Sequence, residues 1–336
     1  MIRVLIAAVI AMVLSIIIGP KFIEFLRRNE FGAHIREEGP EGHRTKQGTP
    51  TMGGLLILVV ATVAFLAVSK YKVPALTVLF VTLGCGAIGF LDDFIKLTHR
   101  RSLGLRGRWK LLLLALITVG VGVAADHQQL PTNVFIPVVH WNIELSWAWY
   151  VLLFLVIAGT ANGVNLTDGL DGLAAGTGII ALITFTAISV VTYIRSGNPG
   201  GRFDSRLDLA IIGAALIGAV IGFLWYNAFP AEVIMGDTGS MAIGGALAAM
   251  AIFTKTIFLL LLIGGIFAIE AFSVIAQVIS FKYFRRRIFL MTPIHHHFEM
   301  KAWSETKIMV RFWIVTAILC AIGFALFYRD FTFFRR

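Results

Sequence analysis

Charged side chains are scarce in this chain: Asp, Glu, Lys and Arg make up 14% of its 336 residues, whereas hydrophobic residues make up 58%. An ordinary soluble domain carries about 25% charged residues, so this composition excludes that class of protein. The apolar residues are collected in repeated segments, and a helix of about 20 such residues crosses a bilayer core about 30 Å thick. The sequence therefore predicts an all-α polytopic membrane protein that forms one domain over residues 1–336.

Cysteine is nearly absent as well. Cys85 and Cys320 lie inside apolar runs that are far apart in the sequence, so we expect buried apolar side chains and no disulfide or metal framework. The first apolar run, residues 2–18, is followed by GPKFIEFL and not by a small-residue cleavage site, which predicts a retained helix. A basic motif interleaved with aromatic residues is also lacking, so nucleic acid is not an expected partner.

Ten apolar segments are candidate membrane spans. The segment 256–281 is too long for one straight crossing and contains Gly264, Gly265 and Glu270, so we expect its helix to kink or break. The connection 126–146 contains two prolines and the alternating sequence WNIELSW, which is compatible with a short hairpin outside the membrane. To within several residues, the expected spans are 2–22, 53–68, 74–91, 111–125, 147–162, 173–193, 209–228, 241–253, 256–281 and 308–327.

Basic residues orient the chain in the membrane. The connections 21–52, 91–110 and 282–307 carry six Lys or Arg residues each, and loops rich in these residues stay in the cytosol. With ten spans, both termini are then expected on the outer side. The formal net charge of +10 therefore reflects topology and attraction to anionic lipid, and not nucleic-acid binding.

Five of the nine aspartates lie at span ends that the charge pattern places in the cytosol. They come from three distant parts of the sequence, and bundling of the helices would bring them together on one face of the membrane. Carboxylates without local basic partners favour a divalent cation, and Mg²⁺ commonly binds one or two carboxylates together with substrate phosphates. The five are Asp92 and Asp93 of FLDDF, Asp168 and Asp171 of NLTDGLDG, and Asp237 of MGDTGS.

Each acidic segment also has a structural interpretation. A carboxylate is suited to cap the helix that starts after it, and this is the alternative for Asp168, Asp171 and Asp237. Asp92 and Asp93 instead follow their expected helix, whose C-terminal end carries partial negative charge and disfavours carboxylates. For them the alternative is a solvated loop pair. Because three independent structural explanations would have to hold at once, we favour a cation among the aspartates.

A phosphorylated ligand also needs cationic groups, and the cytosolic connections contain them. HRTKQGTPTMGG, residues 43–54, places two basic residues before a turn in which glycine permits close backbone approach and threonine supplies hydroxyl groups. It lacks the spacing of a Walker motif. Six more basic residues follow FLDDF up to residue 110, and the three singled out among them, taken alone, favour simple anchoring at the membrane surface. The basic residues concerned are Arg44, Lys46, Lys96, Arg108 and Lys110.

Three consecutive histidines, His295, His296 and His297, lie in MTPIHHHFEMKAW, residues 291–303. Zinc is the first alternative for such a run. Consecutive residues project in different directions, however, and no H-E-x-x-H spacing puts two of them on one helical face. We therefore expect these side chains to form hydrogen bonds near phosphate or sugar groups.

Taken together, these motifs resemble a known family. Their order is similar to that of the phospho-N-acetylmuramoyl-pentapeptide transferases, within the polyprenyl-phosphate N-acetylhexosamine-1-phosphate transferase superfamily. The acidic motifs are shared across the superfamily, whereas PIHHHFE resembles the muramoyl-pentapeptide branch in particular. In sequence order the motifs are HRTKQGTPTMGG, FLDDFIK, NLTDGLDGLA, NAFPAEVIMGDTGS and MTPIHHHFE.

The resemblance implies an enzyme of peptidoglycan synthesis in the bacterial cytoplasmic membrane. It implies that undecaprenyl phosphate attacks the β-phosphate of UDP-N-acetylmuramoyl-pentapeptide on the cytosolic face, which gives lipid I and releases UMP, and that Mg²⁺ is required. The two substrates and membrane lipid are therefore the expected partners. The resemblance does not decide whether the protein forms a homodimer. The isoprenoid chain is longer than the bilayer is thick, so the broken helix over 256–281 is expected to lean into lipid and form a groove for it.

The family pattern also implies roles for the acidic residues and the histidines. Asp92 would deprotonate or orient the lipid phosphate, Asp93 would lie beside it in the metal and phosphate cluster, and Asp237 would ligate Mg²⁺. The three carboxylates together are the expected metal ligands. His295 and His296 are expected to donate hydrogen bonds to sugar or phosphate oxygens and to be needed for turnover.

Residues from several motifs are expected to bind the UDP substrate. By the family pattern, Lys46 contacts the diphosphate region and Asp171 reads the uracil edge. Some relatives stack an aromatic residue on uracil where this chain has Ile234, which leaves the stacking partner open. The other expected substrate-binding residues are Thr51, Asn165, Asp168, Asn227, Lys110 and His297.

Two other functions have to be weighed. An ion-coupled transporter would place acids near the midplane at broken, repeated helices, but only Glu270 has that position and no duplicated pair of interrupted helices is present. A sister transferase that uses UDP-N-acetylglucosamine shares the acidic motifs but carries another sequence in the last cytosolic connection. We therefore predict that this protein uses the muramoyl-pentapeptide substrate and not UDP-N-acetylglucosamine.

Overall fold

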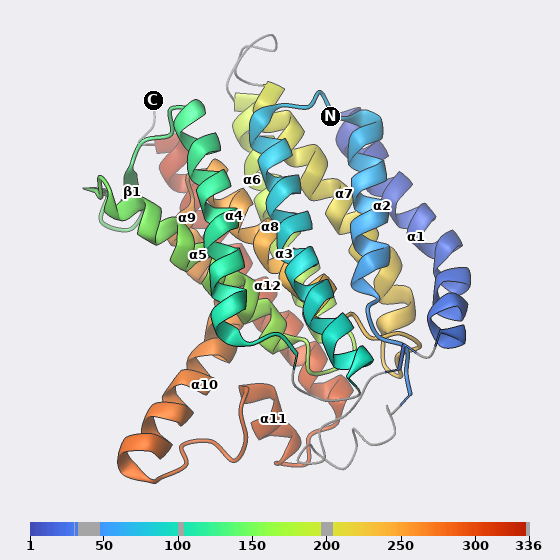
Figure 1. Ribbon diagram of the computed structural model, residues 1–336. Helices are drawn as coiled ribbons and strands as arrows, with labels where there is room; N and C mark the ends of the chain where they lie inside the picture. Colours follow the sequence, from blue (N-terminus) through green and yellow to red (C-terminus); the bar gives the residue numbers. More distant parts are fainter. Residues whose placement is uncertain (30, 33–47, 100–103, 196–203, 334–336) are drawn as a thin grey trace.

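Long helices form almost all of the described chain, which comprises residues 1–29, 31–32, 48–99, 104–195 and 204–333 of this computed structural model. The helices are α1 (Ile2–Arg28), α2 (Gly54–Val68), α3 (Val73–Thr98), α4 (Gly107–His127), α5 (Ala148–Thr167), α6 (Leu173–Arg195), α7 (Asp204–Asn227), α8 (Gly236–Phe253), α9 (Ile257–Ile263), α10 (Gly265–Phe284), α11 (Ile294–Glu299) and α12 (Glu305–Phe333). The start of α1 and the end of α12 lie at one end of the bundle, and the short helix α11 lies at the other (Figure 1).

Membrane-spanning character is evident in most of these helices. Nine helices in the described residues are long and apolar enough to cross a membrane. α2 is also apolar but has only 15 residues. Each of the ten segments expected from the sequence is helical, and the fold class of an all-α polytopic membrane protein is confirmed.

The helix expected over 256–281 is broken, as the sequence predicted. α9 ends at Ile263 and α10 begins at Gly265, with Gly264 as the cap of both. A side chain at Gly264 would crowd the chain, because a Cβ there would lie 2.9 Å from the backbone oxygen of Leu260. Beyond the break, α10 leaves the bundle and extends away from the other helices (Figure 1).

The connection 126–146 contains the short hairpin that its alternating sequence suggested. β1 (Asn133–Ile136) and β2 (Trp141–Glu144) are antiparallel and pair along all four residues of each strand. β1 packs against α9. The hairpin lies towards the end of the bundle opposite α11 (Figure 1).

α8 lies at the centre of the bundle, and its sequence explains why. It is rich in Gly and Ala (GDTGSMAIGGALAAMAIF), and nearly all of its side chains are buried. Small residues allow helix backbones to approach closely inside a membrane. A Cβ added at Gly89 of α3 would lie 2.1 Å from the backbone oxygen of Asp237, and one at Gly54 of α2 would lie 2.1 Å from the backbone nitrogen of Gly239. α8 is therefore packed backbone against backbone on both helices.

The end of α3 differs from the sequence expectation. The helix does not end near residue 91 but continues to Thr98, so Asp92 and Asp93 lie within its last two turns. The residues that follow the aspartates, FIKLT, contain no helix breaker. Lys96 stands one turn after Asp92, where its positive charge is favourable both to the carboxylate and to the helix C-terminus.

The start of α8 also differs from the expectation. α8 begins at Gly236 and not near residue 241, so Asp237 lies in its first turn. A carboxylate is favourable there, because the N-terminal end of a helix carries partial positive charge. Asp237 is therefore a helical residue that projects from the start of the central helix.

The contact between α3 and α8 gives a test of this packing. Gly89→Ala places a methyl group where the backbone of Asp237 lies, so the helices must separate. Overpacking of this kind typically costs about 1–3 kcal/mol, and we expect the variant to unfold at a lower temperature in detergent. Gly107→Ala is the matched control, because a Cβ at Gly107 meets nothing within 4 Å. Equal unfolding temperatures for the two variants would contradict the close approach of α3 and α8.

Candidate active site

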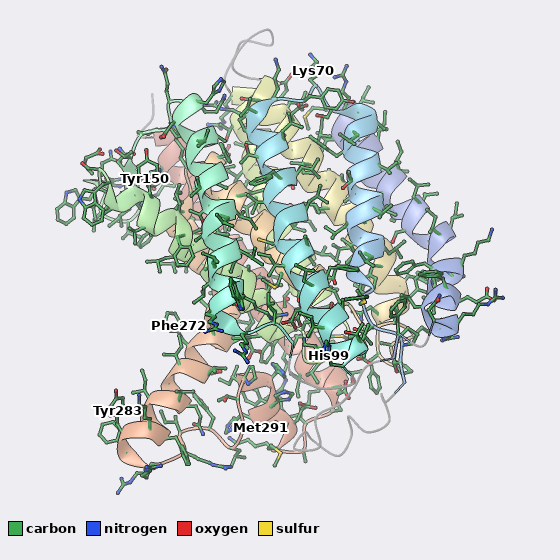
Figure 2. All side chains as sticks on the ribbon, in the orientation of Figure 1. Lys70, His99, Tyr150, Phe272, Tyr283 and Met291 are labelled. Atoms are coloured by element: carbon green, nitrogen blue, oxygen red, sulfur yellow. The ribbon has the colours of Figure 1, made fainter. Side chains whose placement is uncertain are left out.

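The acidic segments and the histidine block lie at the same end of the bundle. His99, directly after α3, and Met291, shortly before α11, are at the lower end in Figure 2, whereas Lys70, between α2 and α3, is at the upper end. α3 carries FLDDF towards the lower end, and the start of α8 lies beside it. Segments that are distant in the sequence therefore meet on one face of the molecule.

Asp92, Asp93 and Asp237 form what we name the acidic cluster. One oxygen of each carboxylate lies within 4.8 Å of the others, and no other group of three or more His, Cys, Asp or Glu residues in the described chain is arranged in this way. Asp92 and Asp93 are only 2% and 4% exposed. Three negative charges this close repel strongly where water is largely excluded, so the cluster requires cationic partners.

Two lysines place positive charge between the carboxylates. Lys96 Nζ lies 2.6 Å from Asp92 Oδ2 and 3.1 Å from Asp237 Oδ1. Lys110 Nζ lies 3.0 Å from Asp92 Oδ1 and 3.0 Å from Asp237 Oδ2. The expectation that these aspartates lack basic partners is therefore wrong, because α3 continues to Lys96 and the first turn of α4 brings Lys110 beside it. The two ammonium groups occupy the space in which a divalent cation would balance the same carboxylates.

Asp93 connects the acidic cluster to the start of α8. Its Oδ2 accepts hydrogen bonds from the backbone N–H of Thr238 (3.0 Å) and from the Thr238 hydroxyl (2.7 Å), and its Oδ1 accepts one from the N–H of Asp237 (3.2 Å). The first N–H groups of a helix lack partners within the helix. Asp93 supplies these partners and thereby fixes the position of Asp237. The Asp93 carboxylate is unfavourable near the C-terminal end of α3, which carries partial negative charge. It is favourable against the N-terminal end of α8, which carries partial positive charge.

Asp92 is enclosed by the chain that precedes α4. Its Oδ1 accepts a hydrogen bond from the backbone N–H of Leu105 at 2.7 Å. Gly104 passes so close that an added Cβ would lie 2.5 Å from the carboxylate. Glycine at this position allows the backbone to cover Asp92, whose carboxylate is held in one orientation.

A polar cavity of about 260 Å³ adjoins the acidic cluster. Asn165, in the last turn of α5, donates a hydrogen bond from Nδ2 to the hydroxyl of Ser240 in α8 (3.0 Å), which joins the two helices. Thr51 enters from the turn before α2, and a Cβ added at Gly236 would lie 3.1 Å from its hydroxyl. The residues that line the cavity include Thr51, Asp93, Asn165, Asp168, Ile234 and Asp237.

The pKa of Asp168 is raised by its surroundings. It follows the last residue of α5 and lies outside the membrane-spanning helices. Burial raises the pKa of Asp168 well above its usual range, and the carboxylates of Asp237 and Asp93 raise it further, although a hydrogen bond from the Gly236 N–H acts in the opposite direction. A carboxyl group that keeps its proton adds no further negative charge to the cavity and can donate a hydrogen bond to a ligand oxygen.

Asp171 and Asn227 connect two loops beside the cavity. Asp171 Oδ2 accepts a hydrogen bond from the Ala231 N–H (3.0 Å). Asn227 Oδ1 accepts one from the Gly172 N–H (3.1 Å), and its Nδ2 donates one to the Val233 carbonyl (2.9 Å). The loop after α5 is thereby attached to the segment that leads into α8. The structure places both side chains as supports of the cavity wall.

Each of the three histidines has a partner within the protein. His295 Nδ1 lies 3.0 Å from Glu270 Oε1, and His296 Nδ1 lies 2.5 Å from Glu299 Oε2. His297 Nδ1 accepts a hydrogen bond from a backbone N–H of the segment before α11 (3.1 Å). Glu270 of α10 and the segment before α11 thereby hold His295 and His297 in place, whereas His296 pairs with Glu299 within α11 itself.

The basic residues expected at the site have different outcomes. Lys46 lies outside the described residues. Lys110 and Lys96 point into the acidic cluster, whereas Arg108 is exposed and stacks on a neighbouring tryptophan at 5.8 Å, which fits membrane anchoring. Lys96 follows Asp92 by four residues, the spacing of an ion pair on one face of a helix. The sequence would have indicated this pair if α3 had been expected to continue past residue 91. No local signal identifies Lys110, because it reaches the cluster from another helix.

Metal binding tests the acidic cluster directly. Asp237→Asn replaces a carboxylate by a neutral amide, so we expect the affinity for Mn²⁺ to fall at least about tenfold, which corresponds to ~1.4 kcal/mol. Titration of the purified protein with Mn²⁺, followed by electron paramagnetic resonance, measures this. Asp126→Asn is the control, because Asp126 is exposed in α4 and accepts a hydrogen bond from Tyr150 outside the cluster. Wild-type affinity in Asp237→Asn would contradict a metal site here.

Comparison with known proteins agrees with the resemblance seen in the sequence. Residues 75–255 match the family model described as glycosyl transferase family 4, and residues 46–58 match signature 1 of phospho-N-acetylmuramoyl-pentapeptide-transferase. A phospho-N-acetylmuramoyl-pentapeptide-transferase from Rubrobacter xylanophilus is 47% identical over 335 residues, which cover 98% of each chain. Proteins of the same name from Halalkalibacterium halodurans and Frankia alni are 45% and 44% identical and cover 95% and 98% of this chain, and 96% and 98% of their own. This chain therefore belongs to the phospho-N-acetylmuramoyl-pentapeptide-transferase family.

Proposed function

We propose that this protein transfers phospho-N-acetylmuramoyl-pentapeptide from its UDP substrate to undecaprenyl phosphate, which gives lipid I and releases UMP in peptidoglycan synthesis. Its membership of a family whose members carry that transferase name supports this activity. The observation that carries the proposal is the acidic cluster, in which carboxylates from α3 and α8 meet beside a polar cavity. Transfer from a diphosphate needs a divalent cation and positive side chains at one place.

Mg²⁺ is the cofactor that the acidic cluster fits. Mg²⁺ prefers oxygen ligands, and Asp92, Asp93 and Asp237 each offer one within 4.8 Å of the others. We assign Asp237 as the principal ligand, because its carboxylate lines the cavity and is the most exposed of the three. Asp92 and Asp93 complete the carboxylate set. A Mg²⁺ ion held by these carboxylates would supply positive charge to the diphosphate of the UDP substrate.

The side chains of the cluster then orient the reacting phosphates. Asp92 accepts the proton of the lipid phosphate, whose oxygen forms a bond to the β-phosphorus of the UDP substrate. The bond between that phosphorus and UMP breaks, and UMP leaves with the electron pair. Lys96 and Lys110 offset negative charge on the transferred group. Because the protein supplies little covalent chemistry in such a transfer, positioning and charge neutralisation provide most of the catalysis.

The polar cavity is the proposed place for the nucleotide diphosphate. Thr51, Asn165 and Asp168 line it and offer polar groups to a ligand. Ile234 lines the same cavity and offers an apolar surface to the uracil ring. The other residues that we assign to substrate binding or turnover are Lys46, Asp171, Asn227, Lys110, His295, His296 and His297.

An apolar groove provides a place for the isoprenoid chain of the acceptor. It has a volume of about 420 Å³ and lies between α5, α9 and α10, where the broken helix leaves the bundle (Figure 1). Gly159 and Gly264 leave it open, and Phe258, Phe267 and Phe272 form part of its wall. A long apolar chain can therefore lie along the outside of the bundle while its phosphate approaches the end that carries the acidic cluster.

The end with the acidic cluster is proposed to face the cytosol. The basic connections that follow α3 and α10 leave the bundle at this end, and such loops stay inside. The start of α1 and the end of α12 then face the outside, as does the hairpin.

Cysteine accessibility tests this orientation in intact cells. The two native cysteines, Cys85 and Cys320, are buried and give a low background. We expect Lys70→Cys to react with a membrane-impermeant reagent added from outside, and His99→Cys and Lys301→Cys to react only after the membrane is opened. Labelling of the His99 and Lys301 positions from opposite sides would contradict the topology.

Release of UMP tests the activity. Purified protein is supplied with Mg²⁺, undecaprenyl phosphate and one UDP-sugar at a time, and we expect turnover of UDP-N-acetylmuramoyl-pentapeptide but not of UDP-N-acetylglucosamine. Removal of Mg²⁺ by a chelator should stop the reaction. Asp92→Asn should lower turnover about 10²–10⁴-fold, because it removes a proton acceptor, while binding of the UDP substrate persists and Asp126→Asn stays active. Efficient use of UDP-N-acetylglucosamine would instead assign the protein to the sister transferases.

A further inference from the structure

Glu270 and His295 form a buried pair at the junction of α10 and α11. Both residues are 0% exposed, and His295 Nδ1 lies 3.0 Å from Glu270 Oε1. Removing a carboxylate from water is costly unless hydrogen bonds compensate. An ionisable residue that is retained inside a membrane protein therefore usually has a function. The acidic cluster does not explain this pair, because neither residue belongs to it.

The outer atoms of the pair have no partners. Glu270 Oε2 and His295 Nε2 are buried, and neither makes a hydrogen bond to any described residue, although buried polar atoms nearly always make one. His295 Nε2 faces the loop after α5, because a Cβ added at Gly169 would lie 2.2 Å from it. Gly169 directly follows Asp168, which lines the polar cavity.

The pair lies between the two proposed substrate sites. Ala268 and Ala271, on either side of Glu270 along α10, line the apolar groove, whereas Glu270 itself is fully buried in the protein. His295 contacts the loop that contributes Asp168 to the polar cavity. The hydrogen bond thus connects α10, the helix of the acceptor groove, to His295 of α11, and the His295 ring lies against the loop of the UDP-substrate cavity.

We propose that Glu270 is a positioning residue for the UDP substrate: it holds the imidazole of His295 with Nε2 towards Gly169, and so keeps the loop after α5 in its binding form. This inference rests on the proposed function, which assigns that loop to the UDP substrate. A carboxylate that accepts a hydrogen bond from Nδ1 favours the tautomer in which Nε2 presents a lone pair. His295 is then an acceptor for a hydroxyl or amide group of the substrate, in contrast to the donating role expected from the sequence.

Steady-state kinetics of Glu270 variants test the proposal. We expect Glu270→Ala to raise the KM for the UDP substrate about 10–100-fold, the usual effect of removing the partner that orients a functional histidine. The KM for undecaprenyl phosphate should not change, and kcat should change less than the KM for the UDP substrate. Glu270→Gln should recover most of the loss, because its amide oxygen still accepts the Nδ1 proton. Glu24→Ala is the matched control, since Glu24 forms an exposed pair with Arg28.

A second variant disturbs the same contact without removing a polar atom. Gly169→Ala places a methyl group against His295 Nε2, so we expect a similar rise in the KM for the UDP substrate. It keeps the proposal testable if Glu270→Ala fails to fold. The double variant Glu270→Ala/His295→Ala should be no worse than His295→Ala alone, because residues that act through one contact are not additive.

Three results would overturn the inference. The first is an unchanged KM for the UDP substrate in Glu270→Ala and Gly169→Ala. The second is an equal rise of KM for both substrates, which general loosening of α10 would produce. The third is a loss in Glu270→Gln as large as in Glu270→Ala, because orientation would then not be the cause. Failure of the wild-type protein to release UMP would instead refute the proposed function.

Discussion

The site depends on one contact, the close packing of α3 on α8. Gly89 lets the two backbones touch, and Asp93 binds the first N–H groups of α8. Because membrane helices associate through close packing and not through a hydrophobic driving force, the small residues of α8 determine how near its neighbours can come. The contact brings Asp92 and Asp93 together with Asp237, which is 144 residues beyond Asp93 in the sequence. The polar cavity and the loops around it are built on this junction.

Charge balance is the second constraint on the site. Three carboxylates in a mostly buried position need compensating charge, and Lys96 and Lys110 supply much of it. In our account a divalent cation takes over this role, and the two ammonium groups become available to the phosphates of the substrates. Burial, followed by the neighbouring carboxylates, also raises the pKa of Asp168.

Several features were predictable because they depend on local sequence. Hydropathy identified the ten apolar segments, and the length and glycines of 256–281 identified the broken helix. The end of α3 was misplaced because hydrophobicity falls at the aspartates while helix propensity does not. The contacts of Lys110 with Asp237, and of Glu270 with His295, were not predictable, since each joins two helices whose relative position follows from packing. Glu270, the one acid whose expected position was compatible with a transporter, forms a buried pair with His295.

Anomalous diffraction from crystals soaked in Mn²⁺ tests the central claim most directly, because it locates a metal ion without reference to activity. The account predicts one strong peak between the carboxylates of Asp92, Asp93 and Asp237, at metal–oxygen distances of about 2.0–2.2 Å. It also predicts that Lys96 and Lys110 Nζ then lie farther from the carboxylate oxygens than the 2.6–3.1 Å described above. A peak elsewhere, or no peak at saturating Mn²⁺, would contradict the account.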